Sequence, residues 1–294
     1  MAEVKANGIT ITYDSFGEDT NPALLLVMGL GGQMIAWDPD FCDMLASRGL
    51  YVIRFDNRDA GLTTYFDHEV VPDMQQLVID LMMGKKPTVP YTLDDMAKDG
   101  IELLSRLGIA KAHVCGTSLG GMIVQAMAIN HPTRVLSMTS MMSTTGNPEL
   151  PKATQGAVAA LTSERANNVD RAMQRAVDVA KVIGSTAYQL DENRLRLKAK
   201  QYFERAFYPE GIARQMAAAI AHGDRRSGLQ KLNIPSLVIH GTDDPLIPVS
   251  GGIDTHKNIS KSELLLIEGM GHDMPLGTWK QIVDAICHLT SRSQ

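Results

Sequence analysis

The sequence predicts an α/β fold in which a mostly parallel sheet carries helices on both faces. Two patterns lead to this prediction: short apolar runs alternate with helical segments along most of the 294 residues, and one long segment breaks the alternation with helices alone. Strand–helix alternation is typical of parallel sheets, because each crossover helix packs back onto the sheet. We therefore expect a core domain built from residues 1–142 and 229–294, and a helical cap (lid) at residues 143–228.

The first part of the chain predicts three strands and one helix. Residues 8–13 alternate apolar and polar side chains, as an edge strand does. Residues 22–27 and 51–55 are mainly apolar and have the length of buried strands. Between them, apolar residues recur at helical spacing and Gly49 provides a stop. These helical positions are Trp37, Phe41, Met44 and Leu45.

A second helix is expected to begin after Thr92. Thr92 with Asp95 three residues later resembles a capping box, with Asp where Glu is usual. Gly108 follows the last apolar position and supplies the end of the helix. The apolar positions are Leu93, Met96, Ile101, Leu104 and Leu107.

Residues 116–120 read Gly-Thr-Ser-Leu-Gly and carry the strongest chemical signal in the chain. They lie between an apolar run at 112–115 and an apolar helical pattern at 121–128. A Gly-x-Ser-x-Gly motif in this setting holds its serine on a sharp, strained turn, with the hydroxyl exposed at the sheet edge. The alternative is an ordinary Gly/Ser turn, because the bare pentapeptide also occurs by chance. The surrounding strand and helix favour Ser118 as a nucleophile.

A nucleophilic serine needs a base, and the base needs a carboxylate that orients it. Both residue types follow apolar strands further along the chain, first Asp243 with Asp244 and then His272. Where a serine lies on this kind of turn, the acid and then the histidine follow it along the chain, and the present sequence has the same order. Pro245 biases the residue before it toward an extended conformation, which favours Asp244 over Asp243 as the orienting acid.

A glycine-rich loop at residues 28–32 follows the apolar run at 22–27. Glycines allow such a loop to approach a substrate carbonyl closely. We expect the backbone N–H groups of Leu30 and Leu119 to form an oxyanion hole. The alternative is a flexible glycine loop without a catalytic role.

Motif by motif, the chain resembles the α/β-hydrolase superfamily, in the branch that contains aclacinomycin methylesterase and related small carboxylesterases. The resemblance covers residues from about 8 to 140 and from about 230 to 290, and fades between them. The stretch Asn57-Arg58-Asp59 points to the branch. The matching motifs are residues 27–29, 54–61, 116–121, 243–245 and 269–272.

The resemblance implies an eight-stranded sheet and a serine hydrolase that uses a catalytic triad. It implies Ser118 as nucleophile, His272 as base and Asp244, the aspartate next to the proline, as the acid. The chain departs from many relatives at Met28, where a histidine is more common. This removes a polar side chain that often braces the oxyanion loop but leaves the backbone donors intact. Arg58 and Asp59 are expected to stabilise their loop through a salt bridge and backbone bonds.

The segment 143–228 holds three groups of apolar residues at helical spacing, which end near Gly184, Pro209 and Gly223. Its apolar face is expected to help form the substrate pocket. For any single Met or aromatic residue there, packing of cap against core is the alternative. The residues that we expect to bind substrate are Met28, Gly29, Met142, Phe203 and Phe207.

Composition excludes several classes of function. A net charge of −5 does not favour a nucleic-acid partner. The sequence has neither an apolar run of the ~20 residues that span a membrane nor the apolar core of a secretory signal at its N-terminus. Three cysteines without a Cys-x-x-Cys pair argue against disulfides and zinc, and the histidines lack metal-ligand spacing. We expect a cytoplasmic enzyme that uses neither metal nor cofactor.

Together these features predict a carboxylic ester hydrolase that acts on a small-molecule ester through an acyl-enzyme. Lactone opening, hydrolysis of a carbon–carbon bond and cofactor-free perhydrolysis use the same triad and stay open as alternatives. Epoxide and haloalkane hydrolysis would require an aspartate in place of Ser118. A non-catalytic binding protein of the same fold would be expected to have lost a triad residue.

Overall fold

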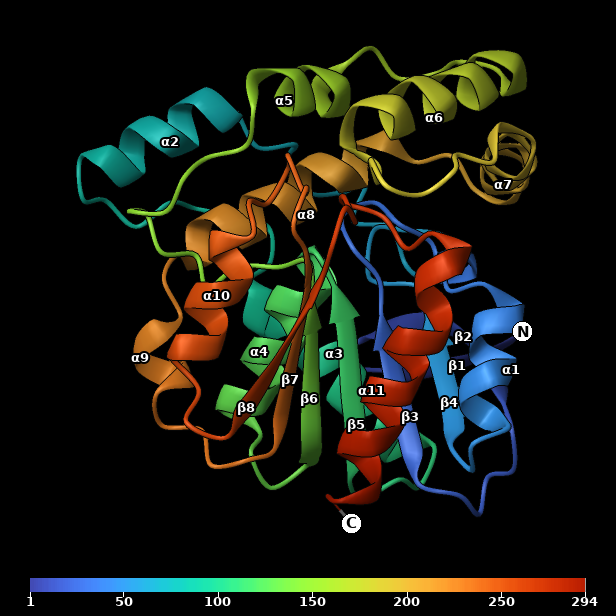
Figure 1. The fold of residues 1–294 in the computed structure, drawn as a ribbon. Coiled ribbons are helices and arrows are strands. Elements are labelled where there is room, and N and C mark those ends of the chain that lie inside the picture. The colour runs from blue at the N-terminus through green and yellow to red at the C-terminus, as the bar shows by residue number, and fades with distance from the viewer. Residues whose placement is uncertain (294) are drawn as a thin grey trace.

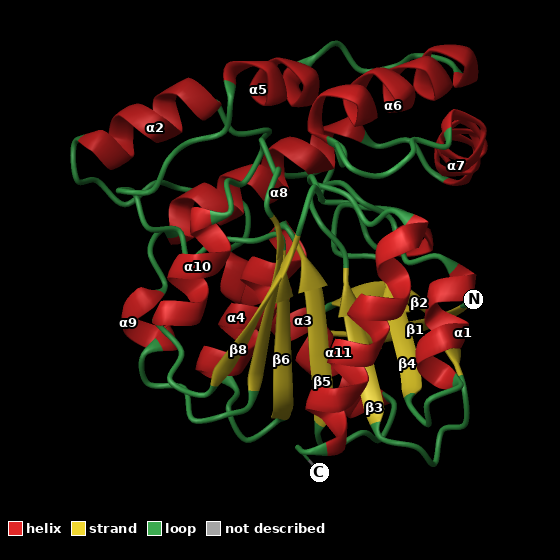
Figure 2. Ribbon diagram, viewed as in Figure 1, coloured by secondary structure: helices red, strands yellow, loops and turns green. Residues whose placement is uncertain are grey.

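The computed structural model describes residues 1–293, and within them the chain forms one eight-stranded sheet with helices on both faces (Figures 1 and 2). The strand order is β1-β2-β4-β3-β5-β6-β7-β8, and β2 runs antiparallel to both of its neighbours while the other pairings are parallel. The predicted fold class is confirmed. The strands are β1 Ala2–Ala6, β2 Ile9–Phe16, β3 Ala23–Val27, β4 Tyr51–Phe55, β5 Ala112–Thr117, β6 Val135–Met141, β7 Ser236–Gly241 and β8 Ser262–Ile267.

The prediction that residues 8–13 form an edge strand was wrong, because β1 covers that edge. β1 and β2 form a hairpin in which Val4 pairs with Ile11. The turn consists of Asn7 and Gly8, which have φ values of 47° and 79°. An Asn-Gly pair with two positive φ angles is the usual signature of a tight hairpin. This local signal could have identified β1 from the sequence.

Helices cover both faces of the sheet. On one face α1 (Pro39–Ala46) and α11 (Trp279–Ser291) pack over a buried cluster that includes Leu26, Phe41 and Ile282. On the other face α3 (Leu93–Arg106) and α4 (Leu119–Asn130) pack over a cluster that includes Leu25. Alternate residues of β3 therefore point into opposite cores, as expected for a strand buried on both sides.

The predicted start and end of α3 agree with the structure. The hydroxyl of Thr92 accepts a hydrogen bond from the N–H of Asp95, and the carboxylate of Asp95 accepts one from the N–H of Thr92, which completes the capping box. Gly108 follows with a φ of 74°, a conformation that glycine adopts at little cost.

A helical insertion lies between β6 and β7, above the carboxyl ends of the parallel strands (Figure 1). A further helix, α2 (Met74–Met82), lies at the same end of the molecule and contacts α8. Sequence analysis did not predict α2. The inserted helices are α5 Gln155–Thr162, α6 Val169–Ile183, α7 Glu192–Arg205, α8 Pro209–His222 and α9 Arg226–Leu229, and α10 Ser250–Lys257 follows β7.

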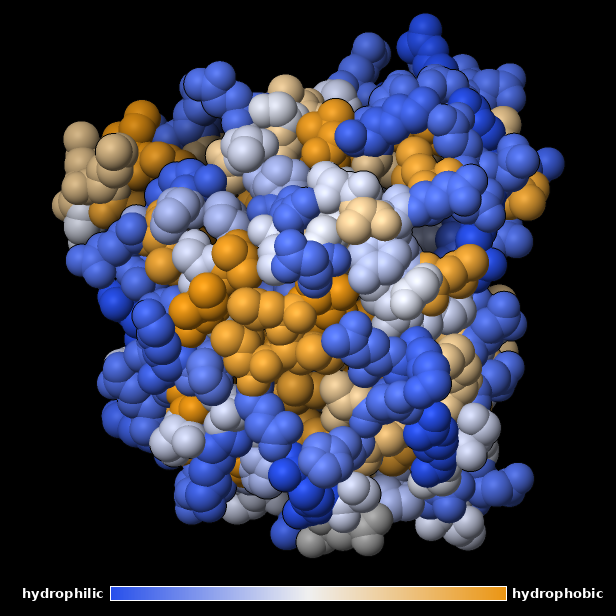
Figure 3. Space-filling view, in the orientation of Figure 1, coloured by the Kyte–Doolittle hydropathy of each residue, from blue (hydrophilic) through white to orange (hydrophobic). Residues whose placement is uncertain are grey.

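Apolar side chains gather on one visible face of the molecule, between α10 and α11 (Figures 1 and 3). The edge strand β8 lies there, and its Leu266 is 39% exposed. Among residues 1–293, no helix has both the length and the apolar character that are needed to span a membrane.

Candidate active site

Ser118 occupies a strained turn between β5 and α4. Its φ is 54° and its ψ is −119°, a combination that costs energy in a residue with a side chain. Its N–H donates to the carbonyl of Met141 at 2.9 Å, and the hydroxyl of Ser143 donates to its carbonyl at 2.8 Å. Met141 is the last residue of β6 and Ser143 lies in the loop after it, so these two bonds attach the turn to the neighbouring strand. The geometry is that of a nucleophile elbow.

The glycines around Ser118 are required by close backbone contacts. A Cβ on Gly116 would lie 2.1 Å from the carbonyl oxygen of Gly120. A Cβ on Gly120 would lie 2.1 Å from the carbonyl oxygen of Val27, at the end of β3. Both distances are far below van der Waals contact with backbone atoms that cannot move independently. The helix therefore approaches β3 and β5 closely, and the serine lies directly beside the loop that follows β3.

Asp244 and His272 meet at the carboxyl ends of β7 and β8. Nδ1 of His272 lies 2.7 Å from Oδ2 of Asp244, and the Asp244 side chain is fully buried. The other carboxylate oxygen accepts hydrogen bonds from the N–H groups of Leu246 and Ile247, both at 2.9 Å. Burial by itself raises the pKa of Asp244, but these bonds and the nearby histidines outweigh it and lower the pKa to about 2.

Asp243 faces away from His272. Its carboxylate accepts hydrogen bonds from the hydroxyls of Thr186 and Thr242 at the surface. Of the two candidate acids, Asp244 is thus the one beside the histidine.

His240 also lies next to Asp244. It is fully buried, with Nε2 2.8 Å from the carbonyl oxygen of Ile247 and 3.5 Å from Oδ2 of Asp244. The position of His240 at the end of an apolar strand suggests only a structural role. Nothing in its local pattern indicates this contact, because the contact depends on how the loop after β7 folds back.

The loop after β3 carries the expected oxyanion donor, Leu30. The N–H of Gly32 donates to the carbonyl of Gly29 at 3.0 Å, which closes a turn with Leu30 and Gly31 in its middle positions. Gly31 has a φ of 63°, a value that favours glycine at this position of a type II turn. A Cβ on Gly29 would lie 3.2 Å from Cβ of Ser118, so the loop passes close to the serine.

A cavity of about 1790 Å³ separates the inserted helices from the carboxyl ends of the strands. Ser118 and His272 line it, and so do Leu30 and Leu119. The five residues that were expected to bind substrate line the same cavity: Met28, Gly29, Met142, Phe203 and Phe207. The structure therefore brings the predicted site residues together, with Asp244 behind His272.

The sequence matches the family described as "alpha/beta hydrolase fold" over residues 22–276. The chain belongs to this family. The resemblance inferred from its motifs is thereby confirmed at the level of the family.

Proteins similar to this chain include a methylesterase, an enol-lactonase and, by fold, a meta-cleavage product hydrolase. The chain is 24% identical to rhodomycin D methylesterase DnrP of Streptomyces peucetius, over 95% of this chain and 94% of that protein. It is 26% identical to 3-oxoadipate enol-lactonase 2 of Acinetobacter baylyi, over 90% of this chain and 86% of that protein. A meta-cleavage product hydrolase of Pseudomonas fluorescens IP01 (CumD) has a similar fold, with a TM-score of 0.78, 18% identity and coverage of 100% and 98% of the two chains.

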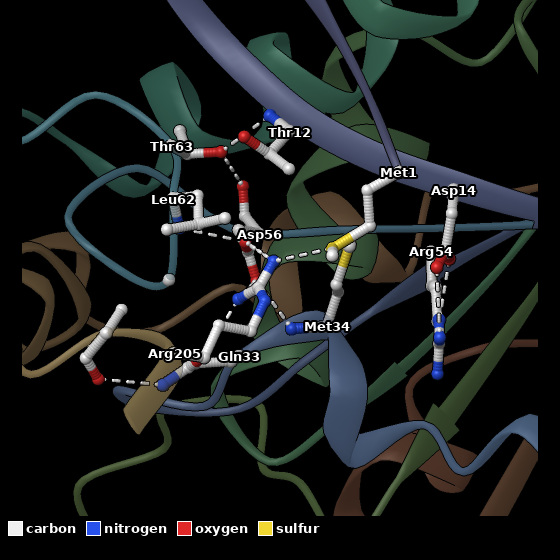
Figure 4. Close-up of polar contacts among 12 residues, drawn as sticks. Met1, Thr12, Asp14, Gln33, Met34, Arg54, Asp56, Leu62, Thr63 and Arg205 are labelled. Atoms are coloured by element: carbon white, nitrogen blue, oxygen red, sulfur yellow. Dashed lines mark hydrogen bonds and ion pairs between the residues drawn. The ribbon is translucent and has the colours of Figure 1, made fainter. Parts of the chain in front are cut away.

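Asp56 connects the segment that follows the glycine-rich loop of this α/β hydrolase to its inserted helices (Figure 4). Its fully buried carboxylate accepts hydrogen bonds from the N–H of Met34 at 2.7 Å and the N–H of Leu62 at 2.9 Å. Arg205, in α7, forms a salt bridge with the same carboxylate at 2.6 Å and also donates to Oε1 of Gln33 at 2.7 Å. Sequence analysis placed Asp56 in a loop motif but did not predict these partners.

Arg58 and Asp59 each form a salt bridge, but with distant partners and not with each other. Arg58 pairs with Asp99 of α3 at 2.7 Å, and Asp59 pairs with Arg214 of α8 at 2.8 Å. Asp59 also accepts hydrogen bonds from the N–H of Phe66 and the hydroxyl of Tyr91. All four charged side chains are almost fully buried, so each charge depends on its partner.

Asn57, between Asp56 and Arg58, donates to the carbonyl of Met28 at 2.8 Å. The Asn57-Arg58-Asp59 stretch therefore touches the glycine-rich loop after β3, α3 and α8 in turn. Within residues 1–293, no three or more His, Cys, Asp or Glu side chains are grouped so that they could hold a metal ion.

Proposed function

We propose that the protein is a serine hydrolase that cleaves a carboxylic ester of a small molecule through an acyl-enzyme. The observation that carries the proposal is the arrangement around the cavity. Ser118 lies there on a strained elbow, and His272 lies there with its Nδ1 2.7 Å from the buried carboxylate of Asp244. The similarity to a methylesterase over nearly the whole chain supports ester hydrolysis.

In the proposed reaction, the hydroxyl of Ser118 attacks the ester carbonyl while Nε2 of His272 accepts its proton. The same nitrogen then protonates the leaving alcohol, and water repeats the cycle on the acyl-enzyme. Asp244 accepts the hydrogen bond from Nδ1–H, which keeps Nε2 unprotonated and directed away from the acid. Its low pKa keeps this carboxylate charged throughout the physiological range.

The oxyanion of the tetrahedral intermediate is proposed to accept hydrogen bonds from the N–H groups of Leu30 and Leu119. Leu119 is the first residue of α4, and the first N–H groups of a helix have no partner within the helix. They also lie at the positive end of the helix dipole, which favours a developing negative charge.

The cap is proposed to select the substrate. A cavity of about 1790 Å³ is larger than the roughly 300–1,000 Å³ of common small-molecule sites, so it suits a bulky substrate. Phe203 and Phe207 of the cap segment have ring centroids 4.8 Å apart, and both line the cavity with apolar surface. Met28, Gly29 and Met142 would contact the substrate near the reacting carbonyl.

The test is a panel of p-nitrophenyl esters with acyl chains of increasing length, assayed with the wild-type protein and with Ser118→Ala. The wild type should hydrolyse part of the panel, and the variant should lose activity by about 10³-fold or more. A fluorophosphonate probe should label Ser118, as shown by peptide mass spectrometry, and should leave the variant unlabelled. Ester hydrolysis that survives in Ser118→Ala would contradict the proposal.

The second candidate is a lactonase, which the 26% identity to an enol-lactonase favours. A set of lactones assayed beside the esters separates the two candidates. Two further assays extend the comparison. A vinylogous diketone tests for carbon–carbon bond hydrolysis, and acetate plus peroxide tests for perhydrolysis. A kcat/KM for any of these that exceeds the best ester by tenfold would reassign the reaction while leaving the triad in place.

A further inference from the structure

The oxyanion loop is held by a helix of the insertion as well as by its own turn. The turn from Gly29 to Gly32 uses the carbonyl of Gly29 and the N–H of Gly32. The N–H of Gly31 donates instead to Oε1 of Gln215 in α8, at 2.8 Å. Neither of these bonds uses the N–H of Leu30, the proposed oxyanion donor.

The side chain of Gln215 is fixed at both ends. Its Nε2 donates to the carbonyl of Arg58 at 2.7 Å, and the residue is fully buried. The carboxamide has one orientation that satisfies both partners, with the oxygen toward the N–H of Gly31 and the nitrogen toward the carbonyl of Arg58. A buried amide held in this way positions a partner accurately, because rotating it would break both bonds at once.

The helix that carries Gln215 is itself anchored next to the loop. Its neighbour Arg214 forms the buried salt bridge with Asp59. A Cβ on Gly211 would lie 2.1 Å from the carbonyl oxygen of Asp59, and a Cβ on Gly31 would lie 2.7 Å from Cγ1 of Ile212. α8 thus packs against the loop that carries Asp59 through its backbone at Gly211, and against the loop after β3 through the side chain of Ile212.

The bond to Gln215 restricts a specific motion of the loop. In a turn of this kind, the peptide unit between the two middle residues can rotate by about half a turn, and glycine at the third position tolerates both orientations. Here that unit joins Leu30 to Gly31, and its N–H is the group held by Gln215. Rotation would turn the N–H of Gly31 away from Gln215 and turn the carbonyl of Leu30 toward it. The carbonyl oxygen would then face Oε1 of Gln215, and two acceptors cannot form a hydrogen bond.

We propose that Gln215 is a positioning residue that holds the oxyanion loop in the conformation in which the N–H of Leu30 can stabilise the transition state. The proposal rests on the function proposed above. It makes part of the oxyanion hole dependent on α8, so that the cap contributes to the rate as well as to substrate choice. Preorganised donors of this type are effective because they need no rearrangement during the reaction.

The test is Gln215→Met, which keeps the length of the side chain and removes both hydrogen bonds. The matched control is Gln125→Met, because Gln125 is also fully buried and also makes two side-chain hydrogen bonds, to Ser140 and Arg225. The expected result for Gln215→Met is a fall in kcat of about 10- to 100-fold with KM changed by less than about threefold. Gln125→Met should keep kcat within about threefold of the wild-type value, even if its thermal stability falls as much as that of Gln215→Met.

Two further readouts separate positioning from a loss of stability. An alkyl trifluoromethyl ketone matched to the best ester forms a tetrahedral adduct, so its Ki should rise in Gln215→Met by the same factor by which kcat/KM falls. Amide hydrogen exchange of a peptide covering residues 28–34 should become faster in Gln215→Met and stay unchanged in Gln125→Met.

The inference is overturned if Gln215→Met keeps kcat within threefold, if it changes KM alone, or if exchange in the loop is unchanged. A wild-type protein with Ser118-dependent activity and an unaffected Gln215→Met variant would overturn this inference alone. A wild-type protein that hydrolyses none of the substrates and binds no phosphonate would overturn the proposed function and this inference with it.

Discussion

Nδ1 of His272 lies 2.7 Å from Oδ2 of Asp244, although the two residues follow different strands and are 28 positions apart. β7 and β8 are parallel neighbours, so the loops after them emerge at the same edge of the sheet. Asp243 emerges there too, yet its carboxylate is turned to Thr186 and Thr242. The difference between these adjacent aspartates yields the first prediction.

Asp244→Asn should reduce kcat by about 10⁴-fold, because an amide can stabilise the wrong tautomer of His272. Asp243→Asn should change kcat by less than about threefold, since its carboxylate contacts surface hydroxyls. Steady-state kinetics on the best ester of the panel measures both. Circular dichroism of the two variants serves as the control for folding. If Asp243→Asn were the damaging substitution, the assignment of the acid would have to be reversed.

His272→Ala should be as damaging as Ser118→Ala, because the two side chains act as one unit. In the wild type, kcat/KM should fall when the medium is acid enough to protonate the base, since only the neutral ring accepts the proton. The pKa of about 2 for Asp244 places the ionisation of that carboxylate below the pH range of the assay. A profile of kcat/KM from pH 4.5 to 8 is the measurement, and a flat profile would argue against a histidine base.

Replacing Phe203 or Phe207 with alanine should change the preference among acyl chains more than the rate on a small acetate ester. Both rings line the cavity on the cap side, so their loss enlarges the pocket where a long acyl or alcohol group would lie. The ratio of kcat/KM for long and short esters reports the change. Val158→Ala, on the cap helix α5, offers a comparison at another cavity-lining position. Unchanged ratios across such cap substitutions would show that the cap does not determine specificity.

His113 should make the stability of the fold dependent on pH. It is buried in β5 with Nδ1 2.8 Å from the hydroxyl of Ser137, and burial lowers its pKa to about 4. The unfolded chain takes up a proton on this side chain near pH 6.5, whereas the folded protein does so near pH 4. Unfolding therefore becomes more favourable as the pH falls through this interval.

The corresponding measurement is urea unfolding of the wild type and His113→Asn at several pH values between 7 and 4. The free energy of unfolding of the wild type should fall relative to the variant by about 3 kcal/mol over this range. The fixed cost of the substitution is the same at each pH and cancels in this comparison. A difference that stays constant with pH would mean that His113 titrates alike in both states.

Those parts of the site that depend on local backbone geometry and on chain order can be predicted from the amino-acid sequence. The glycines around Ser118 and the glycines of the loop after β3 are visible as motifs because close backbone approach excludes other residue types there. The strands that precede Ser118 and Asp244 can be recognised because burial on both faces requires apolar runs. The edge strand before His272 is also a mainly apolar run, although it is only partly buried. Parallel strands then bring their following loops to one edge, whatever the surface residues are.

The polar side chains that hold those loops in place can be identified only from the tertiary structure. Gln215 contacts Gly31 across 184 positions, and Arg205 reaches Asp56 across 149. A glutamine or an arginine on a helix has the same local pattern whether it faces solvent or a buried partner. Its role depends on the packing of α7 and α8 against the sheet edge, and that packing results from contacts spread over the whole chain.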